Sequence, residues 1–116
     1  MRPAEYALCL MEKYMSDFPN QEIFERDNWT CQYCGRSGAN SFEDWNRAWF
    51  AIDHVMPKKH NGSNDPSNLV VACHTCNSIK GADKCNSVED GKEIIKEKKA
   101  GRKKWYLKHV LKTNQK

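Results

Sequence analysis

The sequence of 116 residues lacks several features that would assign it to a common class of protein. It has no apolar run long enough to span a membrane and no signal-like arrangement at its start. Internal repeats and low-complexity stretches are missing as well. Apolar residues make up only 39% of the chain, which is little for a domain held together by burial alone. We therefore expect a single cytoplasmic domain that needs a cross-link in addition to its core.

Six cysteines could supply that cross-link, and four of them form two Cys-x-x-Cys pairs. Thiols stay reduced in the cytosol, so paired cysteines there favour a bound metal over a disulfide. The first pair is followed by Gly35, as in a zinc knuckle whose tight turn aims both sulfurs at one point. Because residues 35–72 separate the pairs, a shared site would clamp the start of the domain onto its middle. The predicted ligands of a structural zinc ion are Cys31, Cys34, Cys73 and Cys76, and Cys9 and Cys85 fit neither pair.

The net charge of +4 is distributed unevenly along the chain. Residues 1–91 hold nine Lys/Arg and thirteen Asp/Glu, whereas residues 92–116 hold ten Lys/Arg and two Asp/Glu. A basic segment of this kind favours polyanionic partners. A solvated tail is the alternative, but Trp105, Tyr106 and Leu107 lie among the lysines and favour a binding segment.

Periodicity and turn residues predict short helices and strands in alternation. The expected elements are a helix at 3–15, a helix at 21–28 capped by Asn20, strands at 48–54 and 69–72, a helix at 75–84, and a C-terminal helical region from the Ser87 capping box to about residue 112. Gly101 is a candidate break in that last region. Residues 36–47 are polar and turn-rich, and residues 57–68 form a loop that lets the two strands pair as an antiparallel hairpin.

A second cluster of polar residues surrounds this predicted hairpin. Asp53 and Asn77 offer hard oxygen ligands, and so few protein ligands suit Mg²⁺ or Mn²⁺, which keep several waters. His54 is a candidate general base beside them. Adjacent strand residues point to opposite faces, so the strand must bend or stop near Pro57 if both Asp53 and His54 are to serve one site. Asn68 could orient the imidazole or hold the loop that presents it.

The order and spacing of these residues resemble the HNH endonucleases, in the branch of that family with a four-cysteine zinc site. The resemblance covers residues 23–81 and rests on Cys31, Cys34, Asp53, His54, Pro57, Asn68, Cys73, Cys76, Asn77, Lys80 and Gly81. It implies an α+β fold: a small zinc-stapled ββα-metal core, made of a two-stranded antiparallel hairpin plus a helix, with flanking helices. It also implies His54 as the general base and Asp53 as the acidic metal ligand. Asn77 stands where the family's last histidine falls, so the chain resembles an His-Asn-Asn variant.

The resemblance implies a metal-dependent enzyme that hydrolyses DNA phosphodiester bonds, by nicking or cleavage, with weak sequence specificity. Residues 1–116 would form one domain, with a helical extension at 1–20, the nuclease core at 21–85 and a basic helical segment at 86–116. The candidate nucleic-acid contacts are Lys58, Lys59, His60, Lys80, Arg102, Lys103 and Lys104.

The alternative function is a zinc-stabilised nucleic-acid-binding module without catalysis. It accounts for the cysteines and the basic segment, but binding alone has no need of Asp53, His54, Asn68 and Asn77 together. The sequence predicts no membrane partner and leaves both a monomer and a homodimer open.

Overall fold

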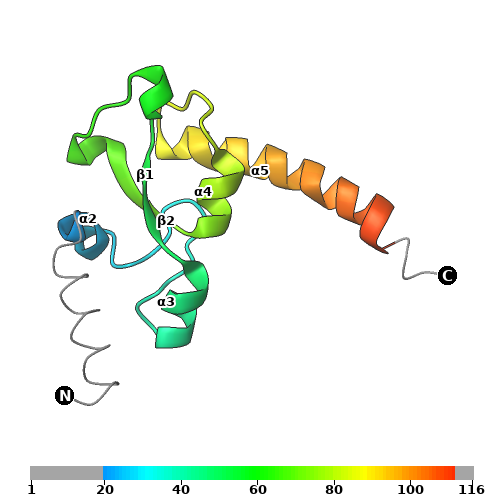
Figure 1. Cartoon of the computed structure of the whole chain (residues 1–116), viewed down its shortest axis with the longest axis horizontal. Coiled ribbons are helices and arrows are strands. Elements are labelled where there is room, and N and C mark those ends of the chain that lie inside the picture. The colour runs from blue at the N-terminus through cyan, green and yellow to red at the C-terminus, as the bar shows by residue number, and fades with distance from the viewer. Residues whose placement is uncertain (1–19, 112–116) are drawn as a thin grey trace, which may run out of the picture.

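The computed structural model describes residues 20–111, and the helix predicted at residues 3–15 lies outside them. A two-stranded antiparallel sheet lies at the centre, with helices around it (Figure 1). The strands are β1 (Ala51–His54) and β2 (Leu69–Ala72), and the α-helices are α2 (Gln21–Arg26), α3 (Phe42–Ala48), α4 (His74–Lys80) and α5 (Val88–Trp105). Two short 3₁₀ turns, η1 (Lys58–His60) and η2 (Pro66–Asn68), lie between the strands, and a π-helical segment, η3 (Tyr106–Leu111), follows α5.

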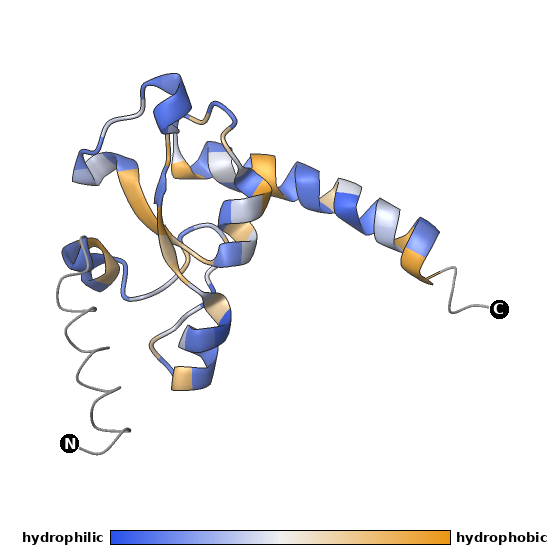
Figure 2. Ribbon diagram, viewed as in Figure 1, coloured by the Kyte–Doolittle hydropathy of each residue, from blue (hydrophilic) through white to orange (hydrophobic). Residues whose placement is uncertain are grey.

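The hairpin confirms the predicted α+β fold. Its register pairs Asp53 with Val70 and His54 with Leu69, so the polar end of β1 lies beside a strand that is buried along its whole length. Figure 2 shows the apolar colouring of β2 against the hydrophilic colouring of most of α5. β1 begins later than predicted, because Ala48 still belongs to α3 and Trp49 follows it in a left-handed conformation, φ 47°.

Helix α2 packs against β2 and holds it in place. Ile23 and Phe24 are buried in the same cluster as β2 side chains. The Asp27 carboxylate accepts a hydrogen bond of 2.9 Å from the Val71 N–H, and Arg26 donates to the Leu69 carbonyl at 2.6 Å. The helix ends at Arg26 rather than at residue 28, because the chain already turns at Asp27.

The predicted cap of α2 is wrong in its detail. The Asn20 side chain makes no capping hydrogen bond. Instead, its backbone carbonyl accepts from the N–H of Ile23 at 2.9 Å.

Helix α3 replaces part of the segment that the sequence predicts as turns. Ser41 caps it, accepting a hydrogen bond of 3.1 Å from the Asp44 N–H, and two acidic residues lie in its first turn. Acidic residues stabilise a helix N-terminus. At the other end of the helix, Ala48 is buried in the core.

Helices α4 and α5 complete the core. Helix α4 is shorter than predicted, since Gly81 follows Lys80 with φ 63° and ends it. Helix α5 begins at the predicted cap, where Ser87 accepts from the Asp90 N–H at 3.1 Å, and it continues through Gly101 without a break.

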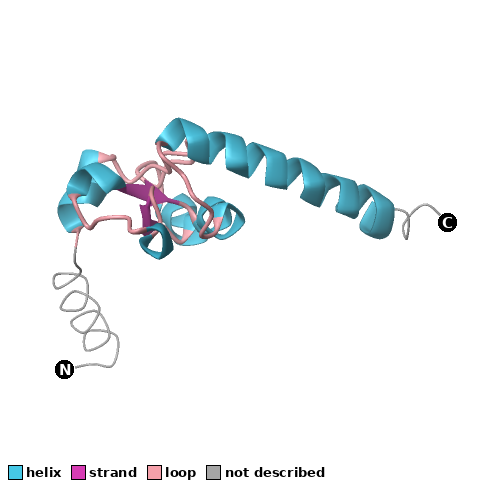
Figure 3. Cartoon of the chain, turned by 90° about the horizontal axis from the view of Figure 1, so that it is seen from above, coloured by secondary structure: helices cyan, strands magenta, loops and turns pink. Residues whose placement is uncertain are grey.

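The two ends of α5 have different surroundings. Its first half packs against the core through Gly91 and Ile95, whereas its second half extends away from the core (Figures 1 and 3). Within residues 20–111, no helix combines the length and the apolar character that a membrane crossing requires.

Candidate active site

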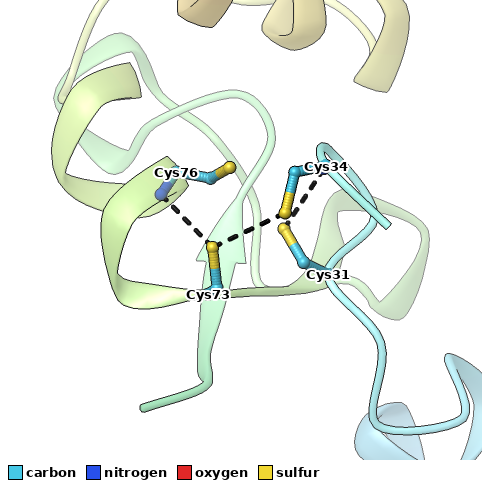
Figure 4. A group of neighbouring side chains, drawn as sticks. All are labelled: Cys31, Cys34, Cys73 and Cys76. Carbon is cyan, nitrogen blue, oxygen red and sulfur yellow. Dashed lines mark hydrogen bonds between the residues drawn. The ribbon is translucent and has the colours of Figure 1, made fainter. Parts of the chain in front are cut away.

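Four cysteines from two distant segments converge beside the hairpin (Figure 4). Their sulfur atoms all lie within 4.8 Å of one another, and the Sγ atoms of Cys34 and Cys73 are 3.8 Å apart. Four sulfurs around a zinc ion in tetrahedral geometry, each about 2.3 Å from the metal, would be about 3.8 Å apart. The predicted convergence of the two pairs is confirmed, and the cluster fits a tetrahedral metal site.

Backbone N–H groups point at the sulfurs of this cluster. Cys34 N–H donates to Cys31 Sγ at 3.5 Å, Arg36 N–H to Cys34 Sγ at 3.4 Å, and Cys76 N–H to Cys73 Sγ at 3.4 Å. Burial acts to raise the pKa of Cys31, but such backbone hydrogen bonds outweigh it and lower the pKa overall. Burial and then the charge of Cys31 raise the pKa of Cys76, so a cation among the sulfurs is needed to hold all four as thiolates.

The Asp53 side chain is buried between the first cysteine pair and helix α4. Its Oδ2 atom accepts a hydrogen bond of 2.5 Å from the Tyr33 hydroxyl and lies 3.2 Å from Lys80 Nζ. Burial, followed by the hydrogen bond to Asp53, raises the pKa of Tyr33, so the hydroxyl keeps its proton and remains the donor. The other carboxylate oxygen, Oδ1, makes no hydrogen bond among the described residues. Every fully buried side-chain oxygen in that part of the chain has a hydrogen-bond partner, so Oδ1 is not fully buried and is open to a ligand.

The placement of Lys80 contradicts the prediction that it contacts nucleic acid. Its side chain is 0% exposed, and its ammonium donates to the His54 carbonyl oxygen at 3.2 Å besides pairing with Asp53. A buried ammonium is costly unless it is paired and hydrogen-bonded, and both conditions are met here. The Lys80 ammonium therefore binds the end of β1 and does not reach the solvent.

His54 lies at the end of β1, half-buried, with its ring facing the loop between the strands. Its Nε2 atom is 2.8 Å from the Oδ1 atom of Asn64. An amide oxygen only accepts hydrogen bonds, so this contact places the proton of a neutral imidazole on Nε2 and leaves the lone pair on Nδ1. Asn64 was not predicted from the sequence, because nothing distinguishes it from the other turn residues of the loop.

Asn68 supports the loop and does not touch the imidazole. Its Oδ1 atom accepts from the Met56 N–H at 2.8 Å, and its Nδ2 atom donates to the carbonyls of Met56 at 3.1 Å and Ser63 at 2.9 Å. Of the two predicted roles, the structure places Asn68 in the loop-holding one. Its backbone carbonyl also accepts from Val55, so both ends of the loop are pinned at this residue.

Asn77 lies in α4, one residue after the cysteine cluster, on a helix that packs against β1. Its side chain is half-buried and makes no hydrogen bond among the described residues. An amide oxygen on α4 and the open carboxylate oxygen of Asp53 on β1 are the donor types that a hard divalent ion takes, together with water and phosphate oxygens. The residues present thus fit such an ion.

The remaining candidates lie on two surfaces. Lys58, Lys59 and His60 are exposed on η1, and Arg102, Lys103 and Lys104 are exposed on the extended part of α5. Lys98 lies between these surfaces. It donates to the Lys80 carbonyl at 3.0 Å and pairs with Asp83 at 2.7 Å, and this pairing lowers the pKa of Asp83.

A hairpin with an Asp-His pair at its end is followed by a helix that begins in a four-cysteine cluster, and together they form a small ββα unit with a candidate metal site at the start of its helix. Residues 31–83 match the family model described as HNH endonuclease. A stretch of 67 residues, 57% of the chain, is 34% identical to the CRISPR-associated endonuclease Cas9 of Corynebacterium diphtheriae. The chain spans only 6% of that protein's length. The comparison with solved structures gave no match.

Proposed function

We propose that the chain is a metal-dependent DNA endonuclease in which His54 is the general base and Asp53 and Asn77 hold one divalent ion. The observation that carries the proposal is the arrangement at the end of β1. There, an imidazole oriented by Asn64, whose Nδ1 makes no hydrogen bond among residues 20–111, follows directly on a carboxylate that has one open oxygen. The HNH family of residues 31–83 supports the same reaction class.

In this proposal each residue has one task. His54 Nδ1 removes a proton from the attacking water, whose oxygen then bonds to phosphorus as the bond from phosphorus to O3′ breaks. Asn64 keeps the imidazole in the reactive tautomer, and Asn68 holds the loop that carries Asn64. A Mg²⁺ or Mn²⁺ ion, when bound, would supply positive charge to the phosphate and the leaving oxygen. The cysteine cluster would hold a structural zinc ion.

A supercoiled plasmid assay tests the proposed function. The purified, zinc-loaded protein is incubated with plasmid in Mg²⁺, in Mn²⁺, and without added divalent ion, and products are separated on agarose. We expect nicked circles or linear DNA only when the divalent ion is present, with 5′-phosphate and 3′-hydroxyl ends detectable by ligation. The metal-free lane controls for a contaminating metal-independent nuclease.

The binding-module alternative predicts a different result. Plasmid that stays supercoiled in every divalent ion, while a gel-shift assay still shows a protein–DNA complex, would overturn the proposed activity and favour that module.

The basic arm, residues 99–111, is the proposed contact for the DNA backbone. It contains five Lys/Arg and no Asp/Glu, lies outside the matched residues 31–83, and extends from the core (Figure 3). By contrast, residues 88–97 hold four Asp/Glu and two Lys/Arg and pack against the core. The charge is therefore placed where α5 leaves the body of the protein.

Replacing Lys103 and Lys104 together with glutamine should weaken DNA binding and flatten its salt dependence. Each phosphate contact contributes about −0.9 to the slope of log K against log salt, so the slope should become shallower by up to about 2. Fluorescence anisotropy with a labelled duplex at several salt concentrations measures it. The matched control is Lys84→Gln with Lys92→Gln, which removes equal charge near the start of α5. Equal slopes for both double variants would show that the arm contributes only general charge.

A further inference from the structure

Tyr33 lies where three parts of the fold meet. It stands between Cys31 and Cys34 in the first cysteine pair, and its side chain is only 8% exposed. Its hydroxyl donates to Asp53 Oδ2 on β1 at 2.5 Å, and Lys80 Nζ of α4 lies 6.0 Å from the centre of its ring. A single side chain thus connects the segment that carries two of the clustered cysteines to the carboxylate beside His54.

Helix α5 also packs against the Tyr33 ring. Gly91 is buried, and a Cβ atom built on it would lie 2.5 Å from Cε1 of Tyr33. A real Cβ never approaches a carbon this closely, so α5 and the ring fit together only because residue 91 is glycine. Gly91 lies beyond the matched residues 31–83, so this contact is added by the part of the chain outside the HNH domain.

We propose that Tyr33 is a positioning residue through which the cysteine cluster and helix α5 fix the Asp53 carboxylate for its divalent ion. The inference rests on the proposed function. Tyr33 and Lys80 both engage Oδ2, which holds the carboxylate plane and leaves Oδ1 as the oxygen free to bind. Partners that orient a metal-ligating group in this way commonly change metal affinity or activity by 10- to 100-fold when they are removed.

Tyr33→Phe tests the hydroxyl without removing the ring. We expect Mn²⁺ to bind about tenfold more weakly, measured without DNA by the electron paramagnetic resonance signal of free Mn²⁺. Zinc content and thermal unfolding midpoint, measured on the same samples, establish that the cysteine cluster and fold are retained. The matched control is Tyr106→Phe, which makes the same change on an exposed tyrosine of η3 and should leave Mn²⁺ binding unchanged.

Gly91→Ala tests the same connection from outside the HNH domain. The new methyl group must displace the Tyr33 ring, and we expect Mn²⁺ affinity to fall several-fold although the substitution lies on α5. Gly101→Ala is the matched control. It lies on the same helix, where a Cβ would meet nothing within 4 Å, and it should leave Mn²⁺ affinity unchanged.

Asp53→Asn in the same Mn²⁺ titration distinguishes the proposed metal site from the positioning role of Tyr33. If the wild type binds Mn²⁺ and Asp53→Asn loses that binding, the proposed metal site is supported. If Tyr33→Phe and Gly91→Ala then bind Mn²⁺ within twofold of the wild type, the positioning role is overturned while the proposed function survives. A wild type that binds no Mn²⁺, or whose binding ignores Asp53→Asn, overturns the metal site and the positioning role together.

Discussion

We expect His54→Ala to lower the rate of metal-dependent plasmid cleavage by about 10²- to 10⁴-fold, the range that general acid–base catalysis contributes. The variant should keep its fold, because the only hydrogen bond of the imidazole among the described residues is to Asn64 on an exposed loop. The contacts that fix β1 here use the His54 backbone carbonyl, which the substitution leaves in place. Cleavage rate, unfolding midpoint and DNA affinity are measured for the wild type and for His54→Ala. Only the cleavage rate should differ between them.

The control for this experiment is His60→Ala, an identical substitution on the exposed turn η1. If His60 only approaches phosphate, this variant should lose no more than a few-fold in rate. Imidazole added to the buffer should partly restore cleavage by His54→Ala, since it replaces the missing base, and should not affect His60→Ala. Full activity of His54→Ala would remove His54 from the reaction and with it the proposed mechanism.

The hairpin and the cysteine cluster could be predicted because each depends on spacing along the chain. Two apolar segments on either side of a loop rich in Asn, Pro and Gly can pair in few ways, and two Cys-x-x-Cys turns present their sulfurs in a known geometry. The position of Asp53 and His54 at the end of β1 followed from the same pattern. The residues that the pattern places correctly are therefore those set by local motifs, namely the loop between the strands and the two Cys-x-x-Cys turns.

Helix α3 and the burial of Lys80 were not predictable on these terms. The helix has only seven residues, and its cap and acidic first turn resemble a polar loop in sequence. Lys80 is three residues after Asn77 on α4, which suggested a surface lysine near phosphate. Lys80 is buried because α4 packs against β1. There its ammonium pairs with the Asp53 carboxylate and donates a hydrogen bond to the His54 carbonyl. Solvent exposure is decided by such distant packing rather than by local sequence.

The same limit explains why the sequence does not predict the contact between Tyr33 and Asp53. A tyrosine inside a Cys-x-x-Cys turn is compatible with simple packing beside the metal. Its link to Asp53 becomes visible only when the cysteine pairs bring residues 31–34 against the hairpin. The cluster thus has two consequences: it joins distant segments, and it delivers a hydrogen-bond donor to the candidate metal ligand.

Removing the metal from the cysteine cluster should unfold the core. Structural zinc in small domains contributes on the order of 10 kcal/mol or more, whereas the stability of a whole domain is only about 5–15 kcal/mol. Cys31, Cys73 and Cys76 belong to the main buried cluster, so releasing them exposes the core that β2 and α4 share. A strong chelator, or Cys73→Ser, should abolish the cooperative unfolding transition in circular dichroism and the dispersed amide signals in NMR spectra. Zinc content measured by mass spectrometry should fall in parallel.

Cys85→Ser is the matched control, because Cys85 is as buried as Cys73 but does not belong to the group of four cysteines. Its thiol donates to the Ser87 carbonyl at 3.1 Å, and a serine hydroxyl can make the same hydrogen bond. We expect this variant to keep its zinc and to lose only about 1 kcal/mol of stability, the cost of an imperfect buried polar group. A protein that stays cooperatively folded after chelation, or a Cys73→Ser variant no less stable than Cys85→Ser, would contradict the structural role. If the protein stays folded after chelation, its apolar core alone is enough to stabilise the fold, despite the low apolar content of the chain.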